Sequence, residues 1–491
     1  MKSISLIKSI FDFKVDRNKK PFFTSLKIFK FLKKTKYDND LDEINLKLSK
    51  IFNIPKKIIS EDLKKSFFSK FNFTNGKFDQ NINNKRILFD LISLVFFIFW
   101  YKIFSKKMVS KNKADIFFDE LDNNDHLKFC EKLHIKFKKK SLFLIKKFSK
   151  KKNCNLKIIS FKKFCIYNSN TLNGNFLNFL KIIIQIFLIS KKNKINLFAV
   201  YNLLIFRIFK YDKIFTENKT KYYFSYKFYN TSLIKNFIYK KKGGLKISYF
   251  QKNLAELSIS FFIKTDILFS LGTGTTKNLK ILGSKIQNII PVGSLMLESE
   301  INKLNTKNDK IDILNIGINW SHRNHTSNID NKIEKYYYDH LKWLKKISNK
   351  FPNLKILIKH HTNYKGDKKE MKILKGTNIK VVSNSNDRNT YQYINDSKII
   401  TSFGSTMILE AKSLNKNCFF LDPNGKNESY FKFLRNNTKL RITSYDQFES
   451  TVNKNLLESN ISKLSYKNNN ENYCIDSSKV SDKIYNNLIS N

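Results

Sequence analysis

Three hydroxyl side chains and a glycine follow an apolar run near residue 400, and a glutamate lies about one helical turn beyond them. The run 398–401 has the character of a strand, and a helix is predicted over 407–414. Free backbone N–H groups and hydroxyls where a helix begins bind anions such as phosphate. A carboxylate one turn further along can accept hydrogen bonds from a ribose diol. The pattern predicts a site for a nucleotide-activated donor, with Ser402, Gly404, Ser405 and Thr406 at the phosphates and Glu410 at the ribose.

Structural roles stay open for the same residues. Ser402 or Ser405 can act simply as the cap of the helix. Glu410 does not fit a capping box, because that motif places a glutamate three residues after the cap, where Ile408 and Leu409 stand. We expect Glu410 to lie off the buried stripe of the helix, where it either binds ribose or is a solvated surface residue.

Two adjacent histidines follow another apolar run. Residues 354–359 are predicted to be a strand, and His360 and His361 come directly after it. Side chains of adjacent residues in an extended chain point to opposite faces. We therefore expect one histidine to be structural and the other to face an anion, to which an imidazole can donate a hydrogen bond. A metal site is not favoured, because no third ligand lies at helical spacing nearby.

Acidic residues follow comparable runs in the first half. Asp119 and Glu120 come after the run 114–118, where a carboxylate can act as a general base toward an acceptor hydroxyl. Glu217 follows the run 212–216, which we also expect to be a strand. A solvated acid at the end of a strand is an equally good interpretation of each.

Apolar runs alternate with stretches of helical period in both halves of the chain. Strands that alternate with helices at this spacing form parallel sheets covered on both faces. Ligands of such sheets lie beyond the carboxyl ends of the strands, so the polar residues after each run are expected to meet at one edge. The predicted strands are 114–118, 212–216, 245–249, 266–270 and 289–294 in the first half, and 311–316, 354–359, 379–382, 398–401 and 418–421 in the second.

The composition limits the class of partner. The chain of 491 residues has a formal net charge of +52, yet seven of its 92 basic residues are Arg. Proteins that bind nucleic acids usually use Arg for bidentate contacts to bases and phosphates, so nucleic acid is not expected as a partner. The excess of Lys favours anionic ligands and anionic membrane surfaces. Five scattered cysteines without a C-x-x-C pair fit a reducing, cytoplasmic setting.

The first part of the chain is Lys-rich and has helical periods without candidate chemistry. Its segment 87–104 has nearly the length of a membrane span, but Asp90 and Lys102 interrupt it. A buried helix is favoured there, and an interfacial helix or a span are the alternatives. The N-terminus lacks the pattern of a signal peptide.

Four regions are predicted, with a polar connector at 297–310 between the two sheets. They are a helical accessory region that is a candidate for membrane association (1–110), an N-terminal Rossmann-like acceptor domain (111–296), a C-terminal Rossmann-like nucleotide-donor domain (311–445) and a C-terminal tail with a helix (446–491).

The pattern resembles the GT-B glycosyltransferases, in which two Rossmann-like domains face a cleft. It is similar in particular to bacterial surface-carbohydrate and capsule proteins, to the glycerophosphotransferases of teichoic-acid synthesis and to the UDP-GlcNAc 2-epimerases. The matching segments are 266–294, 355–363 and 398–423. The resemblance implies that His361, Ser405 and Thr406 contact the donor phosphates and that Glu410 holds the ribose. Related chains often have His-Pro where this one has His361-Thr362, and Gln-His-Gly at 251–253 where this one has Gln-Lys-Asn.

The sequence predicts an α/β protein with a nucleotide-donor site, and the resemblance implies a nucleotide-sugar-dependent glycosyltransferase of surface polysaccharide biosynthesis. Its acceptor is expected to be a saccharide or a lipid-linked saccharide. No metal or other cofactor is expected, because helix ends and cationic groups can neutralise the phosphates. The alternatives are an enzyme like the sugar-nucleotide 2-epimerases and a non-catalytic binding or scaffold protein of polysaccharide assembly. The expected location is the cytoplasm, with peripheral association at the inner membrane as an open alternative.

Overall fold

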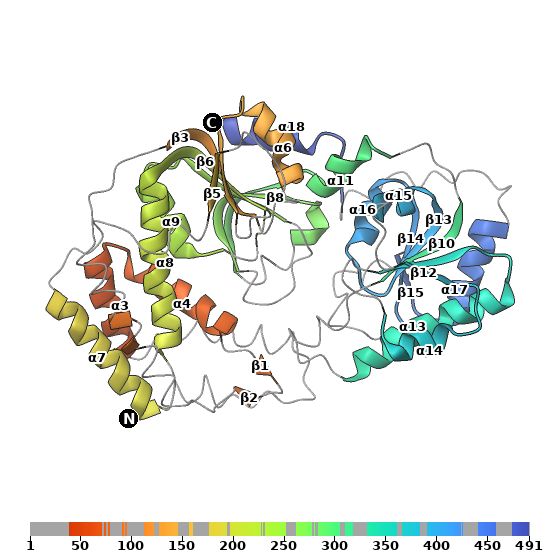
Figure 1. Ribbon diagram of the computed structural model, residues 1–491, viewed down its shortest axis with the longest axis horizontal. Helices are drawn as coiled ribbons and strands as arrows, with labels where there is room; N and C mark the ends of the chain where they lie inside the picture. Colours follow the sequence, from red (N-terminus) through yellow and green to blue (C-terminus); the bar gives the residue numbers. More distant parts are fainter. Residues whose placement is uncertain are drawn as a thin grey trace. The chain divides into compact units, whose positions relative to one another are not determined.

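The computed structural model has two compact units (Figure 1). The first consists of Met1–Phe269, Asn278–Ile290 and Ile484–Asn491, and the second of Ser270–Lys277 and Pro291–Lys483. The structure describes residues 39–70, 73–74, 77–78, 91–92, 94–95, 112–121, 127–145, 157–160, 176–193, 197–226, 228, 231–251, 262–276, 279, 283–304, 310–317, 331–360, 366–382, 390–423, 425, 440–457 and 474–490.

The first unit is built on a seven-stranded sheet in the order β5-β4-β3-β6-β7-β8-β9. The pairs from β5 through β8 are parallel. The chain starts the sheet at β3, adds β4 and β5 on one side, and then returns to add β6 on the other side of β3. The strands are β3 (Asn112–Leu121), β4 (Ser141–Ile145), β5 (Lys157–Ser160), β6 (Asn218–Ser225), β7 (Lys246–Phe250), β8 (Lys264–Ser270) and β9 (Lys285–Pro291).

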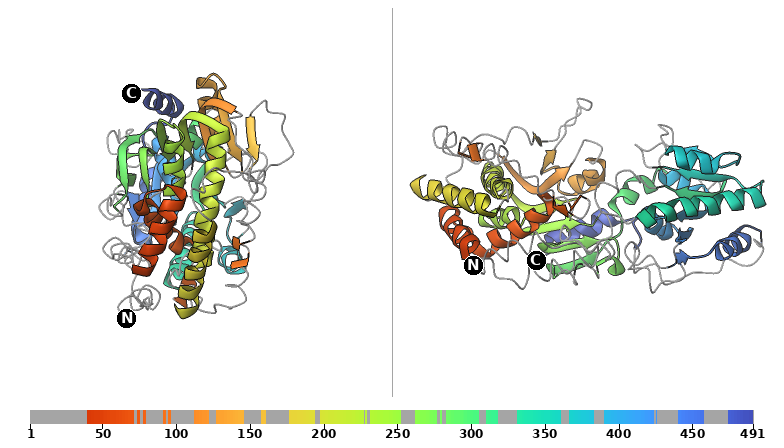
Figure 2. Two further views of the ribbon diagram at one scale, coloured as in Figure 1. Left: turned by 90° about the vertical axis from the view of Figure 1, so that its left-hand side faces the viewer. Right: turned by 90° about the horizontal axis from the view of Figure 1, so that it is seen from below.

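Helices from the beginning and the middle of this unit's sequence share one apolar core with the sheet. Within the predicted accessory region, α3 and α4 pack into that core through Ile44 and Leu63. The Phe52 ring of α3 meets Phe179 of α7 edge-on at 6.2 Å, and Figure 2 shows these two helices side by side. The helices are α3 (Asn39–Phe52), α4 (Lys56–Lys70), α6 (Lys128–Lys136), α7 (Phe176–Asn193), α8 (Phe198–Glu217) and α9 (Leu233–Lys241).

One strand prediction in this unit is wrong. Residues 212–216 form the end of α8, and the strand that follows is β6. A short apolar run at the end of a buried helix has the same composition as a buried strand, so periodicity does not separate the two. Glu217 consequently ends a helix rather than a strand.

The second unit is built on a six-stranded sheet in the order β12-β11-β10-β13-β14-β15, in which every pair is parallel. The five strands predicted in the second half are present, with small shifts at their ends. The predicted α/β class with two Rossmann-like parallel sheets is therefore confirmed. The strands are β10 (Ile311–Ile316), β11 (Ile356–Lys359), β12 (Lys380–Val382), β13 (Ser397–Ser402), β14 (Asn417–Leu421) and β15 (Arg441–Ile442).

The helix α13 (Asn331–Lys350) shows why the second unit folds as its sequence predicts. Tyr337, Leu341 and Leu344 lie on one face and are all buried against the sheet. The helix ends just before Phe351, which precedes a proline and is therefore biased away from helical backbone. The other helices of this unit are α11 (Leu295–Ile301), α14 (Lys368–Leu374), α15 (Thr390–Asn395), α16 (Met407–Ser413) and α17 (Tyr445–Val452), and α18 (Val480–Ile489) follows near the C-terminus.

Within the described residues, no helix has the length and apolar character needed to cross a bilayer. Most of the segment 87–104 lies outside those residues. Leu94 is the described member that is buried, and it belongs to the core of the first unit.

Candidate functional site

The predicted donor loop lies where the strand order of the second sheet reverses. The chain runs from β10 outward to β11 and β12, and then returns to β13 on the other side of β10. Open α/β sheets bind their ligands beyond the carboxyl ends of the strands at such a reversal. The Ser402 hydroxyl at the end of β13 donates to the carbonyl of Ile316 at the end of β10, over 2.7 Å. The two strand ends that flank the reversal are thus joined at the predicted loop.

Hydrogen bonds inside the loop use groups that we expected to face outward. The Ser402 hydroxyl oxygen accepts from the N–H groups of Gly404, at 3.1 Å, and Ser405, at 2.9 Å. The Ser405 hydroxyl oxygen accepts from the N–H of Met407 at 3.3 Å. Thr406 is the N-cap of α16, and its side chain makes no capping hydrogen bond. The Ser402 hydroxyl therefore shapes the turn, and the contact of Thr406 with phosphate stays a prediction.

Glu410 is buried, with 3% of its surface exposed. One carboxylate oxygen accepts from the Ser294 hydroxyl at 2.5 Å, and the other accepts from the Tyr391 hydroxyl at 2.9 Å. Ser294 is also the N-cap of α11. The expectation that Glu410 lies off the buried stripe of its helix is wrong, because α16 is covered on more than one side.

The surroundings of Glu410 extend to the chain near residue 474. Ser477 accepts a hydrogen bond from the backbone N–H of Ser294 at 2.9 Å. Burial, with a smaller contribution from the Glu410 carboxylate, raises the pKa of Cys474 to about 12. Ser294 and Tyr391 were missed in the sequence. The signal for Ser294 was present, since a polar residue after an apolar run and before a helix is the same pattern that marked the Ser402 loop.

His360 is buried at the carboxyl end of β11, with 2% of its surface exposed. Its Nε2 lies 2.5 Å from Oε1 of Glu370, and the other oxygen of Glu370 accepts from the Tyr337 hydroxyl at 3.0 Å. A side chain at Gly317 would collide with the imidazole, so glycine is required where β10 ends. His360 thus takes the structural role that we expected for one of the pair. His361 lies outside the described residues, and its contact with phosphate stays a prediction.

His340 of α13 is a second buried histidine of this unit. Its sequence context did not single it out. The His340 ring stacks on Phe403 with the centroids 5.3 Å apart, and its Nδ1 contacts the backbone carbonyl of Tyr337. Burial lowers the pKa of His340 to about 3, so the ring is neutral at physiological pH. It supports the start of the donor loop through Phe403.

The first sheet reverses its strand order between β3 and β6, and Asp119 lies beside that point. Asp119 is paired in register with Ser225 of β6. It does not terminate its strand as we predicted, because β3 continues to Leu121. The apolar run was a poor guide to the strand end because the strand continues through Asp119, which pairs with Ser225, to Leu121, which pairs with Ile145. The backbone of Glu120 lies in β3, and its side chain is outside the described part.

Asp119 is held in a buried ion pair. One of its oxygens lies 2.5 Å from Nζ of Lys235, and the side chains of Asp119 and Lys235 are 1% and 0% exposed. The Tyr223 hydroxyl donates a short hydrogen bond to the same oxygen. Lys235 comes from α9 and Tyr223 from β6, so the carboxylate joins two strands and a helix. This geometry stabilises the reversal point of the sheet and leaves little of the carboxylate in contact with solvent.

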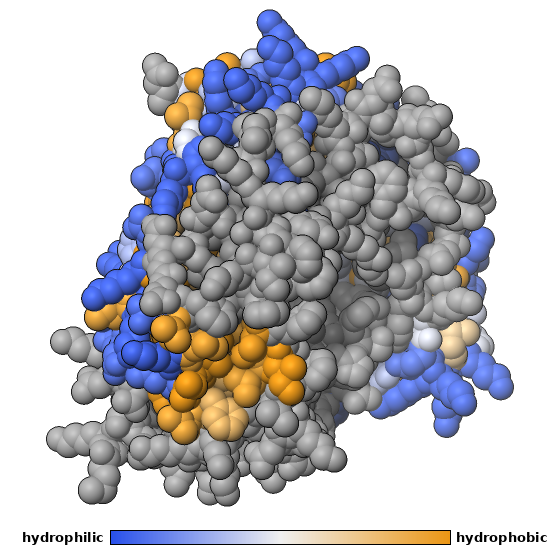
Figure 3. Space-filling model, turned by 60° about the vertical axis from the view of Figure 1, so that its left-hand side comes forward, coloured by the Kyte–Doolittle hydropathy of each residue, from blue (hydrophilic) through white to orange (hydrophobic). Residues whose placement is uncertain are grey.

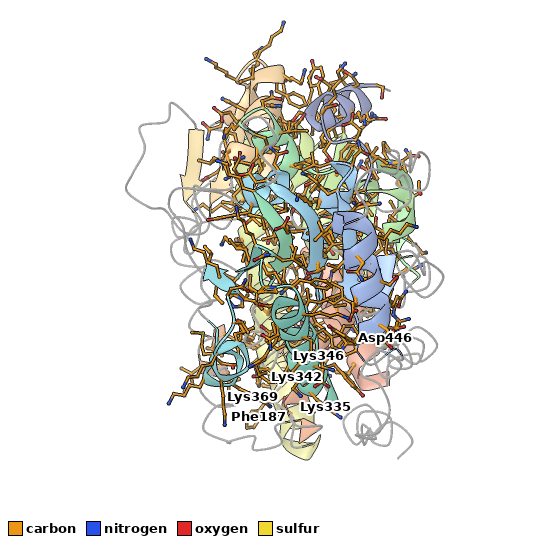
Figure 4. The ribbon with its side chains drawn as sticks, turned by 90° about the vertical axis from the view of Figure 1, so that its right-hand side faces the viewer. Phe187, Lys335, Lys342, Lys346, Lys369 and Asp446 are labelled. Carbon is orange, nitrogen blue, oxygen red and sulfur yellow. The ribbon has the colours of Figure 1, made fainter. Side chains whose placement is uncertain are left out.

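A positively charged groove runs between α13 and α14 in the second unit. It encloses about 460 Å³, and Figure 4 labels Lys335, Lys342 and Lys369 along it. Lys369 lies over the Tyr338 ring, 4.1 Å from its centroid. Such a groove favours anions, but it lies on helices rather than at the strand ends. Its lining consists of Lys335, Tyr338, Asp339, Lys342, Lys369, Lys372 and Ile373.

No protein-family model and no curated protein sequence matches this chain. Three solved structures illustrate what it is similar to. The UDP-GlcNAc 2-epimerase from Neisseria meningitidis bound to UDP-GlcNAc is 13% identical, with 77% of this chain and 100% of that chain covered and a TM-score of 0.42. The UDP-GlcNAc 2-epimerase from Methanocaldococcus jannaschii is 10% identical, with 77% and 99% covered and a TM-score of 0.41. The wall teichoic acid polymerase TagF is 12% identical, with 76% and 88% covered and a TM-score of 0.41. At these identities and scores the likeness assigns neither a family nor an activity.

Proposed function

We propose that this chain is an enzyme of nucleotide-sugar chemistry, and specifically a glycosyltransferase that uses a nucleotide-activated sugar in the biosynthesis of a surface polysaccharide. The observation that carries the proposal is the place of the Ser402–Thr406 loop in the second sheet. Its residues follow the strand next to the reversal of strand order, and a hydrogen bond from Ser402 to Ile316 joins the two strand ends there. This is where parallel α/β sheets bind nucleotides.

In this proposal the second unit binds the donor. The Thr406 hydroxyl and the start of α16 contact the diphosphate, and His361 supplies a further donor of hydrogen bonds. Glu410 binds the ribose diol after a rearrangement that exposes its carboxylate, which is 3% exposed in this structure; each carboxylate oxygen can accept more than one hydrogen bond. Ser294 and Tyr391 orient that carboxylate through the hydrogen bonds that they donate to it.

The remaining parts of the proposal concern the acceptor and the setting. The first unit binds a saccharide or lipid-linked saccharide, and Asp119 or Glu120 acts as general base on its hydroxyl. Donor and acceptor react without a metal, and no nucleic acid takes part. The enzyme works in the cytoplasm at the inner face of a membrane.

A sugar-nucleotide 2-epimerase is the second candidate, and one observation favours it. The Asp119 carboxylate is 1% exposed and paired with Lys235, so an acceptor hydroxyl does not reach it without a rearrangement. An epimerase needs no acceptor and therefore no base of that kind. Turnover of a nucleotide sugar without acceptor, with release of a free sugar or an isomer, would assign the chain to this candidate.

The donor site is tested by titration with UDP, CDP and CMP, followed by calorimetry. We expect Glu410→Ala to weaken the affinity for the preferred nucleotide at least tenfold, since a hydrogen bond to a charged group is worth about 1.5–3 kcal/mol. Tyr391→Phe is the matched control, because it removes a hydrogen bond from Glu410 and keeps the carboxylate. Both variants are expected to lower the melting temperature, and the control is expected to keep most of the affinity. Unchanged nucleotide binding in a folded Glu410→Ala variant contradicts the donor site.

A further inference from the structure

The helix α7 is apolar around most of its circumference, yet one of its faces is exposed. Its inner face carries Phe179 and Ile182, which are 2% and 0% exposed. Its outer face carries Leu177, Ile184 and Leu188, which are 59%, 56% and 57% exposed. These three residues are separated by seven and four positions, so they lie on one side of the helix.

The exposed face continues onto the neighbouring helix. Gln185 of α7 accepts a hydrogen bond from Lys47 of α3 at 3.1 Å and donates one to Glu43 at 3.3 Å. Leu46 of α3 is 44% exposed. Hydrophobic residues gather on the side of the molecule that Figure 3 brings forward. Among the described residues, nine large hydrophobic side chains are exposed, and four of them are Leu46 and the three on α7.

Apolar side chains clustered in this way mark a surface that another body covers. A helix that is apolar on all sides is either buried in a core or in contact with lipid. The inner side of α7 already lies on the core of the first unit. We therefore expect the outer side of α7 to be covered by another apolar surface.

We propose that the outer face of α7, together with Leu46 of α3, docks onto the surface of a bilayer that contains anionic lipids. The charges on α7 fit that partner, and the nearby acidic residue Glu43 of α3 is paired with Lys47 at 2.6 Å. Lys181 is exposed on the same side of the helix as the three apolar residues, and α7 contains three Lys and no acidic residue. The whole chain carries a net charge of +52, and lysines near an anionic lipid surface strengthen attachment.

The position of Lys181 distinguishes a bilayer from a second copy of the chain. Lys181 lies between Leu177 and Ile184 along the exposed face. In a two-fold contact through this face, the lysines of both copies would be brought into one apolar interface. At a bilayer the long side chain can extend to the phosphate groups while its methylenes stay among apolar neighbours. The charge pattern thus favours lipid.

The test is flotation of the full chain with vesicles of phosphatidylcholine, prepared with and without phosphatidylglycerol. The variant Leu177→Gln/Ile184→Gln/Leu188→Gln changes the face, and Leu245→Gln/Met371→Gln is the matched control, because those two residues are 57% and 54% exposed elsewhere. The wild type and the control are expected to float with anionic vesicles and to be released by salt. Each substitution on α7 is expected to weaken vesicle binding about tenfold, so the triple variant stays at the bottom of the gradient.

A second variant covers the case in which the triple variant does not fold. Lys181→Glu keeps the apolar residues, and it is expected to weaken binding to anionic vesicles and to leave binding to neutral vesicles unchanged. The proposal is overturned if the wild type does not float, or if a folded triple variant floats as the wild type does. It is also overturned if the wild type is a dimer in solution that the triple variant dissociates, because a second copy then covers the face.

Discussion

Replacement of Asp119 by asparagine tests whether this residue anchors the first sheet or takes part in catalysis. The Asp119 and Lys235 side chains are 1% and 0% exposed, and 2.5 Å separates the carboxylate oxygen from Nζ. Removal of one partner from a buried ion pair leaves an uncompensated charge and costs about 3–5 kcal/mol. We therefore expect Asp119→Asn to lower the free energy of unfolding by about that amount.

The assay is urea unfolding followed by circular dichroism. With an m-value of about 2–3 kcal/mol/M, the midpoint is expected to fall by about 1–2.5 M. Asp115→Asn is the matched control, since Asp115 lies on the same strand but is partly exposed, and its expected effect is below about 0.5 kcal/mol. The double variant Asp119→Asn/Lys235→Met removes both charges and is expected to recover most of the lost stability.

One result would refute this reasoning. If Asp119→Asn unfolds within about 1 kcal/mol of the wild type while donor turnover in the presence of acceptor falls at least a hundredfold, the carboxylate is a reacting group. The buried pair would then be a resting arrangement that opens on binding. If stability falls and the residual folded enzyme keeps its turnover, the general base is to be sought at Glu120 or elsewhere.

Two further predictions concern buried polar residues. Burial lowers the pKa of His340 to about 3, below its ordinary value of about 6.5. Between pH 6.5 and pH 3 the unfolded chain therefore binds a proton that the folded chain does not. The contribution of the neutral His340 to the free energy of unfolding is complete above pH 6.5 and is lost as the pH falls toward 3. The free energy of unfolding, measured by urea unfolding from pH 6 to pH 4, should fall more steeply for the wild type than for His340→Gln, by about 1.4 kcal/mol per pH unit. Equal slopes would contradict the lowered pKa of His340. Asp62 is buried and accepts from the N–H of Leu233 at 2.7 Å and from Arg207 at 3.2 Å. Asp62→Ala is expected to cost about 3 kcal/mol by urea unfolding, whereas Asp42→Ala, which breaks a partly exposed pair, is expected to cost less than about 1 kcal/mol.

The second half of the chain was easier to predict than the first because its local signals agree with its tertiary structure. The helix α13 has its apolar residues at helical spacing, and a proline follows its end. The strands β11 and β14 are short apolar runs with a polar residue directly after them, β10 is followed by Gly317, and β13 ends in two hydroxyl residues. In the first half, α8 is buried over most of its length, including charged residues such as Asp212 and Lys213. A run such as 212–216 therefore carries no period that distinguishes a strand from a buried helix.

The position of the candidate site could be predicted from the sequence, but its hydrogen bonds and the burial of its residues could not. A glycine between hydroxyl residues after an apolar run marked the Ser402 loop. The direction of each hydrogen bond did not follow from that pattern, because the Ser402 hydroxyl can turn either to a ligand or to its own backbone. Glu410 was placed off the buried stripe of its helix from helical period alone. Its burial depends on Ser294 and Tyr391, which lie 116 and 19 positions away in the chain.

What the sequence by itself determined is the class of the fold, the strands of the second sheet and the edge at which polar residues gather. Those properties follow from local periodicity and from the residues that end each run. Both signals depend only on residues that are close to one another in the sequence. The tertiary structure decided which carboxylates are buried and which side chains contact them, as it did for Asp119 with Lys235 and for Glu370 with His360. The physical reason is that desolvation and pairing depend on neighbours brought from distant parts of the chain, and only packing selects those neighbours.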